Sequence, residues 1–243
     1  AVVPAGATLV LAGDADPAAL RAALEDAFQG WSGGEEAAEI PPLPEQADAR
    51  LVLVNRPGSK QANLTISQAI ALQPTDPDYV ALLVANQILG GSATSRLFLN
   101  LRVAKGFTYG AYSRPTVFEK GLLWTANAEV RNQFAAPALE EMRKEIARMR
   151  DELAPAETLE AAKRYLAGIF LIKLSSIDYA ADTLAGYERN RQAAERELAT
   201  YLERLNALTP EDVRRAAQTY WTPDKMATVV VGDEASLRPV LQP

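Results

Sequence analysis

Arg102 and Tyr109, seven residues apart, carry side chains whose chemistry could act on a bound molecule. A guanidinium presents five N–H donors in a fixed, permanently charged fork, so Arg102 could hold the backbone carbonyl groups of an extended peptide. A phenol hydroxyl can donate a hydrogen bond to an oxygen that gains negative charge in a transition state, which would suit Tyr109. Taken singly, however, an arginine more often lies at the surface, and a tyrosine more often packs against a core.

The amino-acid composition leaves out the groups that usually activate a nucleophile beside such residues. None of the 243 residues is a His or a Cys. Catalytic zinc sites normally use at least one nitrogen or sulfur ligand, and Ser-His-Asp and Cys-His machinery needs histidine. We therefore predict that the chain holds no metal site of its own. The net charge of −6 argues against a nucleic-acid surface, and no apolar run reaches the roughly 18 residues that a membrane span needs.

The hydrophobic patterns around the two residues predict an α+β fold. Residues 63–70 alternate between apolar and polar side chains, which is typical of a half-buried strand, and Ser95 is placed to cap the helix that carries Arg102. The predicted strands cover residues 51–54, 63–70, 109–118, 122–130 and 226–233. The predicted helices cover residues 17–28, 77–89, 96–105, 139–153, 158–174, 179–191, 196–205 and 211–220. We expect a mainly antiparallel sheet layered with helices on one face.

Two short apolar runs that each close on Gly-Asp, at residues 8–14 and 226–233, indicate how the chain is divided. Both are typical of a buried strand with its exit turn, and similar strands far apart in a chain signal duplicated units. Residues 32–48 are rich in Pro, Gly and acidic residues, which favours a semi-rigid linker. We predict that residues 1–31 are the tail of a preceding half, with its last strand and helix, and that residues 49–243 are a C-terminal α+β domain.

A longer pattern surrounds Arg102 and Tyr109: Leu89-Gly90-Gly91, then Ser95-Arg96-Leu97-Phe98, Leu101-Arg102 and Gly106-Phe107-Thr108-Tyr109. Together with the order of the flanking elements, this pattern resembles the C-terminal half of the pitrilysin/insulinase-type zinc metallopeptidases over essentially the whole chain. In that family two α+β halves enclose a chamber, and the N-terminal half binds zinc through an H-x-x-E-H motif. The resemblance implies that this chain forms a metallopeptidase half-shell of the same type.

The resemblance also implies roles for individual residues. Arg102 and Tyr109 would be the catalytic arginine and tyrosine that the C-terminal half contributes, and Gly90, Gly91 and Ser92 would bind substrate. The zinc would be held by an N-terminal half, either upstream in the same polypeptide or in a separate partner subunit. The substrate would be a peptide or an unfolded protein, and the chain alone would be inactive.

Other interpretations of the same residues stay open. Gly90 and Gly91 could simply end a helix, and Arg96 could brace the loop after them by bonding helix carbonyl groups. The family also includes core subunits of a respiratory complex that serve in assembly, and an exposed sheet edge could make the chain a peptide-binding module. An H-x-x-E-H motif in the neighbouring sequence would select the peptidase. The family suggests a bacterial periplasmic location, with the cytoplasm as the alternative.

Overall fold

The computed structural model describes residues 4–34, residue 41 and residues 48–241. At its centre lies a five-stranded sheet with the strand order β1-β5-β2-β4-β3. The strands are β1 (Leu51–Asn55), β2 (Gln61–Ile70), β3 (Thr108–Phe118), β4 (Gly121–Arg131) and β5 (Ala227–Gly232). Strand β1 runs parallel to β5, whereas the pairs β2–β5, β2–β4 and β3–β4 are antiparallel. The prediction of a mainly antiparallel sheet is therefore confirmed.

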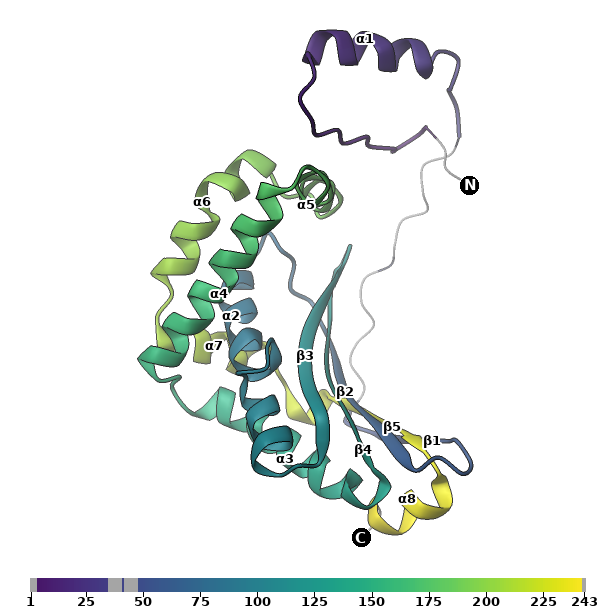
Figure 1. Ribbon diagram of the computed structural model, residues 1–243, viewed down its shortest axis with the longest axis vertical. Helices are drawn as coiled ribbons and strands as arrows, with labels where there is room; N and C mark the ends of the chain where they lie inside the picture. Colours follow the sequence, from purple (N-terminus) through teal and green to yellow (C-terminus); the bar gives the residue numbers. More distant parts are fainter. Residues whose placement is uncertain (1–3, 35–40, 42–47, 242–243) are drawn as a thin grey trace.

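Most of the helices lie on one side of this sheet (Figure 1). The helices of the described residues are α1 (Pro17–Ala27), α2 (Tyr79–Gly90), α3 (Ala135–Asp151), α4 (Ala156–Ser175), α5 (Ile177–Arg189), α6 (Ala194–Ala207), α7 (Pro210–Tyr220) and α8 (Glu234–Leu241), and α1 lies apart from the sheet (Figure 1). Three short segments join them: the π-helix η1 (Phe98–Ala104) and the 3₁₀-helices η2 (Asn132–Phe134) and η3 (Pro223–Lys225). Helices α2, α3 and α7 form the inner layer, and α4, α5 and α6 form the outer part (Figure 1). The layered α+β architecture expected from the sequence is confirmed.

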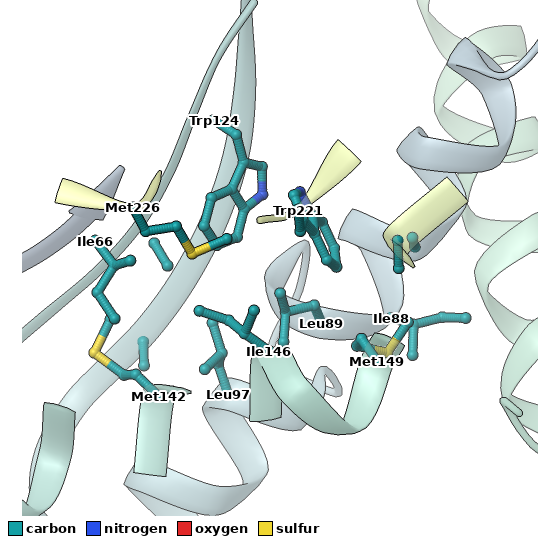
Figure 2. Packing of buried hydrophobic residues seen from close by; sticks show 14 of the residues in the cluster. Ile66, Ile88, Leu89, Leu97, Trp124, Met142, Ile146, Met149, Trp221 and Met226 are labelled. Atoms are coloured by element: carbon teal, nitrogen blue, oxygen red, sulfur yellow. The ribbon is translucent and has the colours of Figure 1, made fainter. Parts of the chain in front are cut away.

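The covered face of the sheet carries the apolar residues that the alternation predicted. Leu64, Ile66 and Ile70 of β2 are at most 3% exposed, and residues on the other face of the strand are exposed or half-buried. Figure 2 shows Trp124 of β4 and Trp221 packed together in this layer, with ring centroids 5.1 Å apart. Because full burial of one large apolar side chain stabilises the fold by about 1.5–3 kcal/mol, this layer fixes how the helices lie on the sheet.

The prediction of a strand at residues 8–14 is wrong. These residues have no regular secondary structure, no strand in the described part of the chain pairs with them, and Leu9 and Leu11 are 56% and 49% exposed. A strand forms only where its backbone N–H and C=O groups find partners on a neighbouring strand. The similar run at residues 226–233 does become β5, because β1 and β2 flank it on both sides.

Two other local predictions have different outcomes. Helix α1 forms as expected, with the Asp16 carboxylate accepting a hydrogen bond from the Ala18 N–H at 3.0 Å. Ser95 does not cap the following helix, because its hydroxyl is buried and has no hydrogen-bond partner among the described residues. Most of the predicted linker at residues 32–48 lies outside the described residues.

Candidate functional site

Arg102 and Tyr109 lie in contact at the edge of the sheet. Arg102 belongs to η1 and Tyr109 to the beginning of the edge strand β3. The guanidinium carbon of Arg102 lies 4.7 Å from the centroid of the Tyr109 ring, and the Arg102 Nη1 group donates to the Thr108 carbonyl at 3.4 Å. Tyr109 is 88% exposed, and its hydroxyl makes no hydrogen bond with the described residues. The structure thus brings the two residues together and leaves the phenol hydroxyl available to a bound molecule.

A β-bulge at the start of β3 sets the direction of Tyr109. Thr108 pairs with Val130 and Ala111 pairs with Ala128, so three steps along β3 match two steps along β4. The Thr108 hydroxyl holds the bulge, because it donates to the Glu129 carbonyl at 2.6 Å and accepts from the Gly110 N–H at 3.2 Å. Bulges of this kind re-aim side chains beside functional sites.

Phe98 and Tyr112 form an aromatic pair on the same two elements as Arg102 and Tyr109, and the sequence interpretation assigned them no role in the site. Their ring centroids lie 5.6 Å apart, and Phe98 precedes Arg102 by four residues on η1. In a regular strand Tyr109 and Tyr112 would point to opposite faces, but the extra residue of the bulge places both on the uncovered face. A Cβ atom on Gly110 would lie 2.6 Å from the Tyr112 ring, so this ring leans back across the bulge. Gly110 inside a strand pattern is the signal that could have revealed the bulge.

The uncovered face of the sheet beside these tyrosines is polar. The Thr65 hydroxyl of β2 donates to the Asn127 side-chain oxygen of β4 at 2.8 Å. The Asn127 amide in turn donates to the Thr125 hydroxyl at 3.3 Å. Tyr112 pairs directly with Asn127 across the sheet, so aromatic and hydrogen-bonding groups are continuous on this face. Such a surface offers both donors and acceptors to the main chain of an extended peptide.

Helix α3 holds η1 in place through a partly buried polar contact. The Asn100 amide of η1 donates to Glu141 Oε2 at 2.8 Å and to Glu145 Oε1 at 2.7 Å. The hydrogen bond from Asn100 is the main cause that lowers the pKa of the Glu141 carboxyl. Glu145 is 3% exposed and also accepts from Arg148. Because Asn100 stands two residues before Arg102, this contact positions the guanidinium relative to the core.

Arg96 does not bond helix carbonyl groups as expected from the sequence. Its Nη1 group is buried without a hydrogen-bond partner among the described residues. Burial is the main cause that lowers the pKa of Arg96, and the neighbouring charge of Arg148 adds to it, whereas Glu145 and Glu152 act in the opposite direction. Arg96 is therefore half-buried, close to the charges of Arg148, Glu145 and Glu152 at α3.

Gly90 and Gly91 have packing roles that explain why both are glycines. A Cβ atom on Gly90 would lie 2.8 Å from the Ser113 Cβ atom and closer still to the Ser113 backbone nitrogen. A Cβ atom on Gly91 would lie 2.7 Å from the Cα atom of Gln87. The Ser92 hydroxyl shares a 3.0 Å hydrogen bond with that of Thr94. No hydrogen bond or ring contact joins these three residues to Arg102 or Tyr109 in the described part of the chain.

Replacing Gly90 with Ala is expected to lower the free energy of unfolding by about 1–3 kcal/mol, because the new methyl group must displace the backbone of β3. Gly168 in the middle of α4 has open space around it and is the matched control. Its replacement with Ala should raise stability by roughly 0.5–1 kcal/mol, the helix penalty of glycine. Chemical denaturation of both variants measures the difference. Equal or greater stability of the Gly90 variant would show that α2 does not pack as closely on β3.

Neither a metal site nor a membrane helix is found in the residues that the structure describes. They contain no group of three or more His, Cys, Asp or Glu side chains that could hold a metal ion. With no His or Cys in the sequence, the donors present do not fit a catalytic zinc ion. Among the described helices, none is both long and apolar enough to cross a membrane.

Comparison with known proteins identifies the family. Residues 2–166 match the family described as the peptidase M16 inactive domain. The "Probable inactive metalloprotease YmfF" of Bacillus subtilis (strain 168) is 38% identical over 73 residues, which are 30% of this chain and 17% of that protein. The "Uncharacterized zinc protease YmxG" of the same organism is 28% identical over 149 residues, which are 59% of this chain and 35% of that protein.

A solved structure supports the same assignment. The crystal structure of a peptidase M16 inactive domain from Pseudomonas fluorescens superposes with a TM-score of 0.82 at 26% identity, and the match covers 91% of this chain and 52% of that one. The chain thus spans about half the length of that structure and a smaller part of the two curated relatives. On the strength of the matched family and the shared fold, this chain belongs to the peptidase M16 inactive-domain family.

Proposed function

We propose that the chain is the substrate-binding, non-zinc half of a peptidase of this family. In this proposal Arg102 and Tyr109 act on a peptide whose scissile bond lies at a zinc site held by an N-terminal half or a partner subunit. The observation that carries the proposal is the contact between the Arg102 guanidinium and the exposed Tyr109 ring, at the margin of the uncovered polar face. The description of the family as an inactive domain agrees with a chain that hydrolyses nothing alone.

The geometry supports a division of work between the two side chains. Tyr109 has an exposed hydroxyl with no protein partner among the described residues, so this group is free to donate to an oxyanion as it forms. Arg102 uses one nitrogen on the Thr108 carbonyl, which leaves further N–H groups of its fork for a peptide carbonyl. The cation over the ring face also restrains the Tyr109 side chain. Activation of the attacking water falls to groups outside this chain.

The proposed division of the chain follows from the same reasoning. Residues 1–31 would be the tail of a preceding half, residues 32–48 the linker and residues 49–243 the C-terminal domain. No residue of α1 is buried, and Phe28 and Trp31 are 44% and 43% exposed although their rings contact each other. Apolar side chains in this condition support the idea that the tail packs against a unit other than the domain described here.

Two alternatives remain distinct from the peptidase. A structural or assembly role would need no working site, and the relative named an inactive metalloprotease gives it support. A peptide-binding module would use the uncovered face or the β3 edge without any hydrolysis. The contact between Arg102 and Tyr109 argues against complete loss of function. A purely structural chain would not need an exposed phenol that is held by a cation.

The proposal is tested by reconstitution. The purified chain should bind no stoichiometric zinc after dialysis and should not cleave a library of fluorescence-quenched peptides. The same library should be cleaved when the chain is joined to, or mixed with, the H-x-x-E-H half. A zinc ion retained at one site per chain would refute the division of roles. An assembly that contains zinc yet cleaves no peptide would favour the structural alternative, and peptide binding without cleavage would favour the binding module.

A further inference from the structure

A cavity on the helical side of the molecule has a lining that the proposed peptidase role does not explain. It measures about 600 Å³ and lies between helices α2, α4, α5 and α6, whereas Arg102 and Tyr109 belong to η1 and β3. This volume is within the range of sites for small organic molecules. Five aromatic residues take part in its lining: Tyr79, Phe170, Tyr179, Tyr187 and Tyr201.

The tyrosines of the lining present hydroxyl groups that the protein does not use. Tyr79, Tyr187 and Tyr201 come from three different helices, and their hydroxyls make no hydrogen bond with the described residues. Burial raises the pKa of Tyr79 and of Tyr201 to about 12, and the neighbouring charge of Glu197 adds to the effect at Tyr79. The phenols therefore stay neutral, with oxygen lone pairs and electron-rich ring faces available to a ligand.

Glu197 adds a half-satisfied carboxylate to the same cavity. It is 7% exposed, and its Oε2 atom accepts a hydrogen bond from Arg204. Its Oε1 atom makes no hydrogen bond with the described residues. Asp182 also lines the cavity, and Lys173 contributes a positive charge. A carboxylate oxygen that remains free among aromatic rings is a natural acceptor for a charged N–H group.

Four aliphatic side chains also line the cavity. Val80 and Leu83 come from α2, and Leu166 and Ile169 come from α4. The ring centroids of Phe170 and Tyr201 lie 4.7 Å apart. The aliphatic and aromatic parts of the lining are therefore adjacent. The cavity therefore combines an apolar part with a polar part, and a complementary ligand would be amphipathic.

We propose that this cavity binds an amphipathic primary amine, with its ammonium group at Glu197 Oε1 among the tyrosine rings and its apolar body against Leu83 and Leu166. The ring faces attract the cation and the free carboxylate oxygen accepts its hydrogen bond. The site does not depend on the peptidase role, since it shares no residue with the Arg102–Tyr109 site.

The test uses three probes with the same eight-carbon chain and different head groups: n-octylamine, n-octanol and n-octanoate. Isothermal titration of the full chain at neutral pH should show one saturable site for octylamine. Its Kd should be lower than that of octanoate by about tenfold or more, with octanol between them. Glu197→Gln should remove most of this preference, and a thermal melt checks that the variant is folded. Octanoate binding as tightly as octylamine would overturn the proposal.

A steric variant tests the location without changing a charge. Thr183 of α5 lines the cavity and bonds the Tyr179 carbonyl through its hydroxyl at 2.7 Å. Thr183→Trp should abolish octylamine binding by filling the cavity. Thr219 of α7 makes the same type of bond, to the Arg215 carbonyl at 2.8 Å, but does not line the cavity, so Thr219→Trp should bind as the wild type does. Unchanged binding by a folded Thr183→Trp protein would place any octylamine site elsewhere and refute the inference.

Discussion

In the proposed assembly with a zinc-binding half, replacing Tyr109 with Phe is expected to lower kcat by about 10²–10³, the usual cost of removing one donor to an oxyanion. The change deletes only the hydroxyl, which makes no hydrogen bond with the described residues, and leaves the ring beneath Arg102. The melting temperature should therefore stay the same and KM should change little. Steady-state kinetics with a defined peptide, together with a thermal melt, measure all three quantities.

The matched control is Tyr165→Phe on α4. Tyr165 is 46% exposed, and its hydroxyl likewise lacks a hydrogen bond to the described residues, but it lies on a different element from η1 and β3. This variant should keep the wild-type kcat. If Tyr109→Phe also keeps the wild-type kcat in a folded, zinc-loaded assembly, Tyr109 contributes only contact area and the proposed donor role is wrong.

Replacing Arg102 with Ala is expected to lower kcat/KM by about 10-fold to 150-fold, since a hydrogen bond to a charged group contributes roughly 1.5–3 kcal/mol. The fold should tolerate the change, because the one hydrogen bond that Arg102 is shown to make is a 3.4 Å contact with the Thr108 carbonyl. Lys at this position should recover only part of the loss, since it keeps the charge but not the planar fork. Kinetics and a thermal melt on the same preparations separate substrate handling from stability.

Arg131 supplies the control for the cation–ring contact. Its guanidinium carbon lies 4.8 Å from the Phe134 ring centroid, close to the 4.7 Å of the Arg102–Tyr109 pair, but at the end of β4. Arg131→Ala should leave kcat/KM unchanged. The Arg102→Ala, Tyr109→Phe double variant should lose less than the sum of the two single losses if the residues act on one bound peptide. If Arg102→Ala lowers the melting temperature and kcat/KM falls only in proportion to the folded protein, Arg102 stabilises the fold and does not bind substrate.

Local signals in the sequence determined the elements of this fold. The capping box at Thr209 and Asp212 places the start of α7, and the structure shows the Asp212 N–H donating to the Thr209 hydroxyl at 3.2 Å. The alternation in residues 63–70 places the buried face of β2 correctly. Caps and periodic burial are encoded within a few residues, so they can be found without knowing the rest of the chain. The run at residues 8–14 shows the limit, because a strand also needs a partner that local sequence does not reveal.

The resemblance to the metallopeptidase family singled out Arg102 and Tyr109, but only the tertiary structure decided how the pair is built. Side chains alternate between the two faces of a regular strand, so the sequence alone would place Tyr109 and Tyr112 on opposite faces. The bulge held by Thr108 places both on the uncovered face. Gly90, which the resemblance assigns to substrate binding, lies where α2 closely approaches β3, and this packing could not be found from local sequence. The cavity around Glu197 joins four helices that no local pattern connects. Sequence patterns report the burial and conformation of each element separately, and contacts between distant elements arise only when the elements pack together.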